Sequence, residues 1–385
     1  MKKNGDKIAI IGGGIGGLTM ALTLKKTNKR FKLFEKSKEF KEIGAGIGIA
    51  SNALEIFDKL NVGNELRRKG HLLKRTILAT EKLKVLKTIP FPKEVYCIHR
   101  SLIIDAISNK LDQESYELNK EVESIENKEK IKVRFKDETI EEFDTLIASD
   151  GINSTIRKSV FPEIGIRHAD QVIWRGITKF DINADLKHTY YELFEGTLRF
   201  LFLPLNDTEI FWLAVQEKKN FNKNSSTSLK SYLLRIYRNF SPIVLNILTK
   251  TIESDIIQNE LADIKPYYKS WFKNNTVFIG DSIHATTPNL AQGACQAIED
   301  AYTLGLCMKN NTNNPFIDYQ NIRLKKVEYI VKQSWKIGKM SLTTSSLQKK
   351  LLHLFLRLLP NKQYQKRFKC VIDIEYLNEL ESPLK

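Results

Sequence analysis

The sequence predicts an α/β fold: a Rossmann-like nucleotide-binding domain interrupted by a mostly antiparallel β-sheet domain and followed by C-terminal helices. Three observations lead to this prediction. A short apolar strand, a glycine-rich turn, a helix and a second strand open the chain over 7–35, which is a βαβ beginning. Strand-like segments rich in aromatic and β-branched residues fill 172–215. The chain from residue 321 onward has a helical pattern and contains no substantial strand candidate.

The opening segment carries the first chemical signal. KIAII (7–11) reads as a buried parallel strand, and Gly12, Gly14 and Gly17 form GxGxxG directly after it. One glycine makes the tight turn, one admits a pyrophosphate to the backbone, and one lets helix and strand pack closely. Glu35 ends the second strand, where an acidic residue accepts bonds from a ribose, and Lys36 beside it is also predicted to contact the cofactor. The segment therefore predicts binding of an adenine dinucleotide.

The middle and late parts of the chain contain further predicted strands and helices. Short alternating pieces over 72–95 indicate strands that leave the first domain, and 97–111 is a helix entered through His99 and Arg100. IKVRF (131–135) and DTLIASDG (144–151) read as two strands that return to the nucleotide domain. VFIGDSIHATTP (277–288) is a second glycine-bearing strand and turn, and a long helix follows it.

Composition bounds the class of protein. The 385 residues carry a net charge of +16, which attracts anions, nucleic acid or an anionic membrane, or else reflects a lysine-rich surface without a specific partner. No nucleic-acid motif accompanies the lysines, so no nucleic-acid partner is expected. The chain lacks a long apolar run, and its four cysteines are scattered. We therefore expect a cytoplasmic protein without a metal site.

Three motifs in order, GGGIGGL (12–18), SDGINSTIR (149–157) and IGDSIHATTP (279–288), resemble those of the class A flavoprotein monooxygenases. That family includes 4-hydroxybenzoate hydroxylase and the tetracycline-inactivating monooxygenases, and the resemblance covers nearly the whole chain. It implies a Rossmann-like FAD-binding domain of the GR2 type. The implied domain order is FAD-binding domain at 1–71, 97–170 and 271–320, substrate domain at 72–96 and 171–270, and a C-terminal helical region at 321–385.

The resemblance also implies which residues hold FAD. Asp281 is expected to bond the ribityl chain, and Arg100 to reach the pyrophosphate or the ribityl region. Asp150 and Arg157 are expected to serve both FAD and the reduced nicotinamide, or alternatively to form a structural ion pair. Where many relatives have GQG, this chain has Ala291 before Gln292 and Gly293, so the loop loses one glycine's freedom. Backbone passing beside the cofactor is expected at Gly44, Ala45, Gly46, Pro288, Gly293 and Ala294.

The activity that the resemblance implies is hydroxylation of an aromatic or polycyclic small molecule. NAD(P)H reduces FAD, O₂ adds to the reduced ring, and a flavin hydroperoxide delivers one oxygen atom. The alternative within the same superfamily is an epoxidase or a reductase of an isoprenoid or lipid-like substrate. Arg199 is the first candidate to face the pocket, because an arginine stands near this position in related enzymes.

Other side chains leave alternatives open. Tyr191 is the candidate phenol group, although strand alternation points only one of Tyr190 and Tyr191 inward. His284 reads as a catalytic base or, as we prefer, as a structural residue near FAD. The basic, amphipathic segment from Leu347 to Lys369 either packs on the FAD domain, which we favour, or lies on an anionic membrane.

Overall fold

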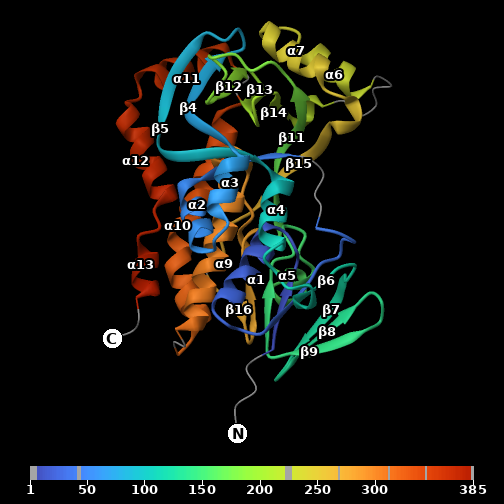
Figure 1. Cartoon of the computed structure of the whole chain (residues 1–385). Helices are drawn as coiled ribbons and strands as arrows, with labels where there is room; N and C mark the ends of the chain where they lie inside the picture. The colour runs from blue at the N-terminus through green and yellow to red at the C-terminus, as the bar shows by residue number, and fades with distance from the viewer. Residues whose placement is uncertain are drawn as a thin grey trace.

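The computed structural model describes residues 7–40, 45–221, 228–267, 269–310, 313–342 and 345–382. A parallel-sheet domain and a second, larger sheet are stacked one above the other, and the C-terminal helices run along one flank (Figure 1). This arrangement confirms the predicted α/β fold with a second sheet domain and C-terminal helices.

The nucleotide-binding half is a six-stranded sheet in the order β16-β17-β10-β1-β2-β6. Its central strand β1 (Ile8–Ile11) is buried along its whole length and pairs in parallel with β2 and β10. A strand covered on both faces reads as a continuous apolar run, and this is the pattern that predicted it. The other strands are β2 (Phe31–Phe34), β6 (Tyr116–Glu117), β10 (Thr145–Ala148), β16 (Phe272–Lys273) and β17 (Thr276–Phe278).

Two helices pack in parallel beside this sheet, α1 (Ile15–Lys26) and α9 (Gly293–Lys309). Their first turns approach through Gly16, whose added Cβ would lie 3.2 Å from Ala297 Cβ. Further along, a Cβ at Gly305 would lie 2.3 Å from Thr23 Cγ2. The N-termini of both helices therefore lie at the same end of the sheet. The remaining helices of this half are α2 (Ser51–Lys59), α3 (Gly63–Lys69), α4 (Arg100–Ser108), α5 (Thr155–Val160), α8 (Asp281–His284) and α10 (Pro315–Met340).

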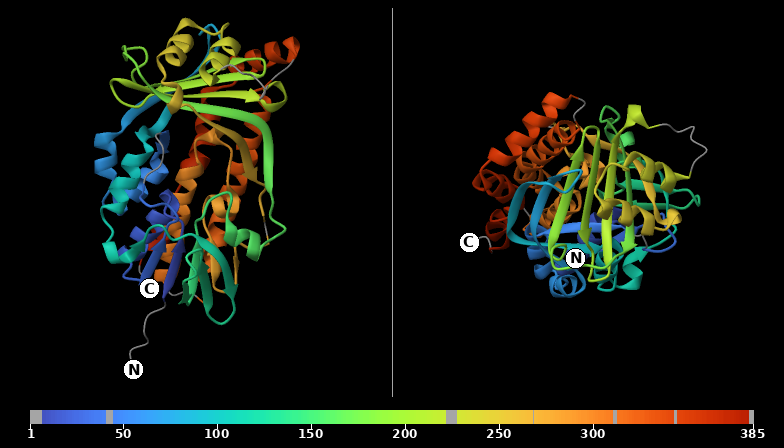
Figure 2. Two further views of the ribbon diagram at one scale, coloured as in Figure 1. Left: turned by 90° about the vertical axis from the view of Figure 1, so that its right-hand side faces the viewer. Right: turned by 90° about the horizontal axis from the view of Figure 1, so that it is seen from above.

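The second half is an eight-stranded sheet in the order β15-β11-β14-β13-β12-β4-β5-β3. Helices α6 (Leu229–Ile236) and α7 (Pro242–Lys250) cover one face, and the other face looks toward the nucleotide-binding half (Figure 2). The strands are β3 (Gly46–Ala50), β4 (His71–Thr80), β5 (Val85–His99), β11 (Ile166–Lys179), β12 (Thr189–Glu195), β13 (Leu198–Pro204), β14 (Glu209–Glu217) and β15 (Ile257–Ile264).

Three details differ from the sequence-based expectations. The strand at 131–135 is β8 (Ile131–Phe135) of a separate antiparallel sheet with β7 (Val122–Asn127) and β9 (Ile140–Phe143). Its residues alternate between buried and exposed, so it is a half-covered strand outside the six-stranded sheet. In addition, β3 lies within the range assigned to the first domain but pairs with β5 in the larger sheet, and α6 and α7 were not predicted.

The C-terminal region is helical, as expected. After α10 come α11 (Ser346–Leu358), α12 (Asn361–Ile372) and α13 (Tyr376–Glu381). Over the described ranges, no helix combines the length and the apolar character needed to cross a membrane.

A buried group of charges joins α9 to α10. The Arg323 guanidinium donates from Nη1 to Glu299 Oε2 at 2.5 Å and from Nε to Asp300 Oδ1 at 2.8 Å. All three side chains are fully buried. Burial alone would raise the pKa of Asp300, but the neighbouring His284 and Arg323 outweigh it and hold the pKa below its usual value. Removing one partner would leave the others as uncompensated buried charges.

We therefore predict that Arg323→Met lowers the free energy of unfolding by about 3–5 kcal/mol, measured by urea denaturation. Lys332→Met on the exposed side of the same helix is the matched control and should change this free energy by less than about 0.5 kcal/mol. Equal stability of the two variants would contradict a structural role for the buried charges.

Candidate cofactor and substrate site

The three glycines of the first turn have distinct surroundings. Gly12 has a φ of +106°, and an added Cβ would lie 2.4 Å from the Ser149 carbonyl oxygen. A Cβ on Gly17 would lie 1.9 Å from the Gly12 carbonyl oxygen. A Cβ on Gly14, at the N-terminus of α1, would meet nothing within 4 Å. Two glycines thus allow close packing, while the third leaves open space where a phosphate reaches the helix amides.

Glu35 follows β2 and stabilises the same turn. Its carboxylate accepts hydrogen bonds from the backbone N–H of Gly13 at 2.5 Å and of Ser37 at 2.9 Å. The neighbouring Lys36 is exposed. The carboxylate therefore lies at the edge of the turn, and ribose binding by Glu35 and a cofactor contact of Lys36 stay predictions.

The late glycine motif is held from α9 by one buried carboxylate. Gly280 has a φ of +58°, and its N–H donates to Asp300 Oδ2 at 2.8 Å. The same oxygen lies 2.5 Å from His284 Nε2. His284 also packs beside the Trp271 ring at a centroid distance of 5.1 Å. These contacts support the structural interpretation of His284.

Asp281 follows this turn, and we call its surroundings the Asp281 recess, because solvent reaches the residue although protein atoms crowd around it. Its side chain is accessible to solvent, yet surrounding protein atoms reduce its hydration and raise its pKa. His284 and Arg100 act in the opposite direction, so Arg100 lies within electrostatic reach of Asp281. A Cβ on Gly293, the first residue of α9, would lie 4.0 Å from Asp281 Oδ1. The structure thus brings Arg100, Asp281 and Gly293 together from distant parts of the chain.

The middle motif contributes an acceptor without a partner. Asp150 Oδ2 accepts from the Ile156 N–H at 3.3 Å, whereas Oδ1 is buried and finds no hydrogen-bond partner within the described residues. Burial raises the pKa of this carboxyl group. Buried polar atoms normally have a partner, so Oδ1 is suited to a ligand donor. Because Gly12 packs against Ser149, this oxygen is close to the first turn.

Arg157 has a different environment from the one expected. Its guanidinium donates to the carbonyl oxygens of Ser282 at 2.6 Å, Ile152 at 2.6 Å and Ile164 at 3.4 Å. It therefore links the second motif to the third through backbone carbonyls, which is a structural role; the ion pair that the sequence left open as an alternative is not formed among the described residues. Its part in cofactor binding stays a prediction.

The remaining predicted residues lie near the same recess or against the second sheet. Gly46 is required by packing, because its added Cβ would lie 2.6 Å from Phe211 Cγ. Pro288 is exposed at the start of a 3₁₀ turn (Pro288–Leu290), and Gly293 and Ala294 begin α9. Gly44 lies outside the described residues.

An extended dinucleotide fits this arrangement. Two helix N-termini lie side by side, Gly14 leaves an open approach to one of them, and Asp150 offers an acceptor atom that no described residue bonds. Asp281 lies in a recess near the other N-terminus.

On the substrate side, Arg199 of β13 is almost fully buried and forms several polar contacts. Its Nη2 pairs with Glu192 Oε1 at 2.6 Å. Its Nη1 donates to Asn289 Oδ1 at 2.7 Å and to Ser341 Oγ at 3.1 Å. Arg199 therefore ties the loop after the late glycine motif to the second sheet, in addition to any contact with a substrate.

The structure does not support Tyr191 as the pocket phenol. Tyr191 stacks on Phe202 at 4.9 Å within the cluster under α6 and α7. Strand alternation instead places Tyr190 on the face of Glu192 and Arg199, since Arg199 pairs with Phe194 across β12 and β13. Burial first, and the Glu192 carboxylate next, raise the pKa of Tyr190 well above its usual value.

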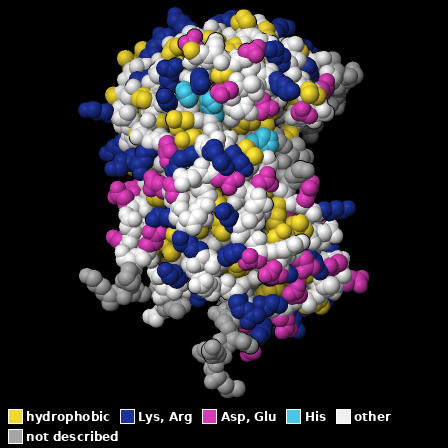
Figure 3. Space-filling view, in the orientation of Figure 1, with side chains coloured by type: hydrophobic (Ala, Val, Ile, Leu, Met, Phe, Trp, Pro, Cys, Tyr) yellow, Lys and Arg dark blue, Asp and Glu magenta, His cyan; other side chains and the backbone are white. Residues whose placement is uncertain are grey.

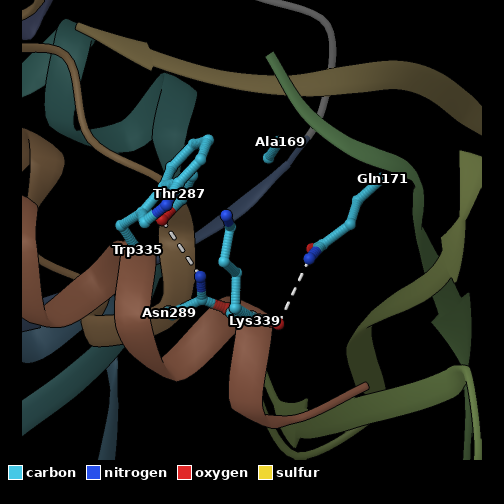
Figure 4. Close-up of a pocket in the computed structure, with 7 residues that line it drawn as sticks. Ala169, Gln171, Thr287, Asn289, Trp335 and Lys339 are labelled. Atoms are coloured by element: carbon cyan, nitrogen blue, oxygen red, sulfur yellow. Dashed lines mark hydrogen bonds between the residues drawn. The ribbon is translucent and has the colours of Figure 1, made fainter. Parts of the chain in front are cut away.

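A small cavity lies behind this group, between α10 and β11 (Figure 4). Its volume is about 10 Å³, which admits one water molecule and excludes an aromatic substrate. Asn289 lies beside it and donates to Thr287 Oγ1 at 3.0 Å and to the Ser334 carbonyl oxygen at 3.0 Å. The cavity is thus part of the framework that orients Asn289 toward Arg199.

Sequence reasoning missed several of these side chains. Glu192 had a signal, because an acidic residue two positions after Tyr190 shares its strand face. Asp300 had a weaker one, as the second of two adjacent acidic residues within a mostly apolar helix. Asn289 and Ser341 had none, since their contacts depend on the tertiary structure.

Comparison with known proteins agrees with this geometry. Residues 6–313 match the family described as FAD binding domain. The chain is 26% identical over 349 residues to the aurachin C monooxygenase/isomerase of Stigmatella aurantiaca, covering 88% of this chain and 90% of that protein. It is 27% identical over 367 residues to the 2-heptyl-3-hydroxy-4(1H)-quinolone synthase of Pseudomonas aeruginosa, covering 92% and 94%.

The fold is also similar to solved structures. The HpxO protein of Klebsiella pneumoniae, solved with FAD and uric acid, superposes with a TM-score of 0.87 at 21% identity, covering 95% of this chain and 96% of that one. The chain belongs to the FAD-binding-domain family of flavin-dependent monooxygenases and aromatic hydroxylases. The predicted family and the prediction of FAD as cofactor are confirmed.

The glycine surroundings predict different outcomes for two matched substitutions. Gly14→Ala should fold normally but weaken FAD binding at least about tenfold, because the methyl group occupies the open approach to the α1 amides. Gly17→Ala should unfold at a lower temperature, because its methyl group overlaps the Gly12 carbonyl. FAD titration and thermal unfolding of the cofactor-free protein measure both. Unchanged FAD affinity in Gly14→Ala would contradict this assignment.

At Ala291, in contrast to Gly17, we predict that a substitution increases stability. Ala291 has a left-handed backbone conformation, with φ of +51° and ψ of 37°, which costs a residue with a Cβ about 1 kcal/mol. Ala291→Gly should therefore raise the free energy of unfolding by up to about 1 kcal/mol. Ala294→Gly, in the first turn of α9, should lower it by about 0.5–1 kcal/mol. Urea denaturation of the cofactor-free protein measures both, and a less stable Ala291→Gly would refute the strain at this position.

Proposed function

We propose that this flavoprotein is an NAD(P)H-dependent monooxygenase that hydroxylates a nitrogen heteroaromatic ring of the quinolone type with an apolar substituent. The observation that carries the proposal is a polar group, Tyr190, Glu192 and Arg199, on the face of the second sheet that looks toward the cofactor half. The quinolone class comes from the product named for the Pseudomonas aeruginosa relative.

The rest of that sheet face is mostly apolar, with Arg175 and Gln171 of β11 as polar exceptions. In the register of β13, β14 and β11, the residues that share the face of Arg199 include Leu201, Leu213, Phe211, Ile173 and Ile177. Such a surface would pack against an aromatic ring and keep water away from the bound cofactor. The polar group then supplies the few oriented contacts that a mainly apolar ligand site needs.

The chain's own residues would divide the work as follows. FAD, held by the first glycine turn, Asp150 and Asp281, supplies the oxygen-activating chemistry when bound. The Tyr190 phenol is protonated at neutral pH, and burial raises its pKa further, so it is available as a hydrogen-bond donor. Glu192 accepts a hydrogen bond from a ring N–H or O–H, which favours attack by increasing electron density on the ring. Arg199 holds Glu192 and the Asn289 loop in place.

NAD(P)H as reductant and the cytoplasm as compartment belong to the same proposal. The family resemblance supports both the nicotinamide and its use without a second dinucleotide domain. The unpaired state of Cys97, Cys295, Cys307 and Cys370 accords with a reducing compartment.

The proposed reaction is tested with purified, FAD-loaded protein and a panel of alkyl quinolones, simple phenols, purines and isoprenoids. The expected result is faster NAD(P)H oxidation with an alkyl quinolone, little peroxide, and a product heavier by one atom of ¹⁸O from ¹⁸O₂. An epoxidised or reduced isoprenoid would favour the alternative activity. Oxidation that no heteroaromatic compound accelerates would count against the proposal.

The two neighbouring tyrosines give a matched pair of variants. Tyr190→Phe should lower kcat at least about tenfold, because it removes a hydrogen-bond donor from the sheet face that looks toward the cofactor half, which we call the pocket face. Tyr191→Phe should stay within about twofold, because that ring packs under α6 and α7. FAD content should be unchanged in both. A larger loss in Tyr191→Phe would reverse the assignment of the two faces.

A further inference from the structure

Helix α11 carries a row of exposed apolar side chains, which we call the α11 stripe. Its members are 45–71% exposed and follow the spacing i, i+4, i+7, i+8, i+11, which places them on one side of a helix. The opposite side of α11 packs inward through Leu352 and Leu356 against β4, β5 and β12. The stripe consists of Leu347, Leu351, Leu354, Phe355 and Leu358.

This concentration is unusual within the molecule. The described residues include eleven exposed large hydrophobic side chains, and five of them belong to this one helix of 13 residues. Isolated exposed apolar residues are normal on a protein surface. A contiguous group of them, in contrast, marks a surface that contacts another protein, a membrane or a ligand. We therefore expect the α11 stripe to contact a partner.

The charged residues of α11 and of the following helix α12 are all basic. Residues 346–372, which form α11 and α12, contain seven Lys and Arg and no Asp or Glu. Lys349 points inward and pairs with Glu195, whereas the other basic side chains are exposed. Figure 3 shows hydrophobic and basic side chains intermixed on the flank where α11 and α12 lie in Figure 1. The exposed basic residues are Lys350, Arg357, Lys362, Lys366, Arg367 and Lys369.

This pattern distinguishes between possible partners. A second copy of the chain packed stripe to stripe would bring like charges together without an acidic residue of α11 or α12 to pair with them. An anionic lipid surface satisfies both features, because it takes up apolar side chains and attracts the basic ones. With 13 residues, α11 is too short to span a bilayer but long enough to lie in its interface.

We propose that the α11 stripe and its exposed basic neighbours dock the protein on the surface of an anionic phospholipid bilayer. The helix lies parallel to the membrane plane, with the stripe at the boundary of headgroups and acyl chains. Membrane contact through this segment was the less favoured interpretation of the sequence, and the exposure of the stripe in the folded chain is what favours it.

The docking surface adjoins the pocket face of the second sheet. Leu356 of α11 packs in one cluster with Leu78 and Phe194. Phe194 pairs across the strands with Arg199, whose guanidinium lies 5.9 Å from the Phe194 ring centroid. A substrate with an apolar chain, if the proposed function holds, would thus pass from the bilayer to a neighbouring pocket. This second part rests on the proposed function, whereas the docking itself does not.

The docking is tested by co-sedimentation of the full FAD-loaded chain with vesicles of phosphatidylcholine and phosphatidylglycerol at 3:1, and with phosphatidylcholine alone. We expect binding to the anionic vesicles that weakens as salt increases. Leu351→Gln combined with Leu354→Gln should lower the partition constant at least about tenfold. Ile252→Gln combined with Ile317→Gln, which changes two exposed apolar residues outside α11, should leave it within about twofold. FAD content and circular dichroism verify that each variant is folded.

Three results would overturn the docking proposal: no binding of the parent protein to anionic vesicles, equal binding of the stripe variant, or a dimer in sedimentation that the stripe variant abolishes while vesicles remain unbound. Substrate delivery has its own measurement. The stripe variant should raise KM for an alkyl quinolone presented in vesicles and leave KM for a water-soluble quinolone unchanged. An absence of turnover with any quinolone would overturn the proposed function without changing the vesicle result.

Discussion

The arrangement of the cofactor site depends on the contacts that the buried Asp300 carboxylate makes with three parts of the chain. From one buried position on α9 this carboxylate accepts the Gly280 N–H, contacts His284 and pairs with Arg323 of α10. It therefore fixes the turn before Asp281 relative to two long helices. Burying a charge is costly unless it is paired, and here the pairing also sets the geometry of a ligand site. The turn before Asp281, helix α9 and helix α10 are therefore held in fixed positions relative to one another.

The parallel packing of α1 and α9 explains why motifs more than 260 residues apart act on one ligand. Glycine at Gly16 and Gly305 lets the helices approach closely, so both N-termini open at one end of the sheet. The second sheet then closes over that end with an apolar face and a small polar group. Dinucleotide binding and substrate enclosure thus come from separate halves of the chain, and Arg199 links the halves through Asn289 and Ser341.

Much of the fold and of the cofactor site was predictable because the signals are local. Gly12 is required by its φ of +106° and Gly17 by the Gly12 carbonyl of the same turn, so their spacing is visible in the sequence. The choice between Tyr190 and Tyr191 was not predictable, because alternation separates two faces without telling which face α6 and α7 cover. The role of Arg157 was equally hidden, since its carbonyl partners include the distant Ser282. Burial of α11 was misjudged because an amphipathic pattern identifies an apolar face but not what covers it.

The central claim is that both glycine motifs hold one FAD molecule, and calorimetric titration of the cofactor-free protein tests it most directly. The titrants are FAD, ADP and riboflavin 5′-phosphate. The account predicts one FAD per chain, competed by ADP through the first turn and by riboflavin 5′-phosphate through the Asp281 recess. FAD should bind far more tightly than either half, because linking two ligands makes the second contact intramolecular. FAD that binds no more tightly than ADP would contradict the account, since the late motif would then hold no part of the cofactor.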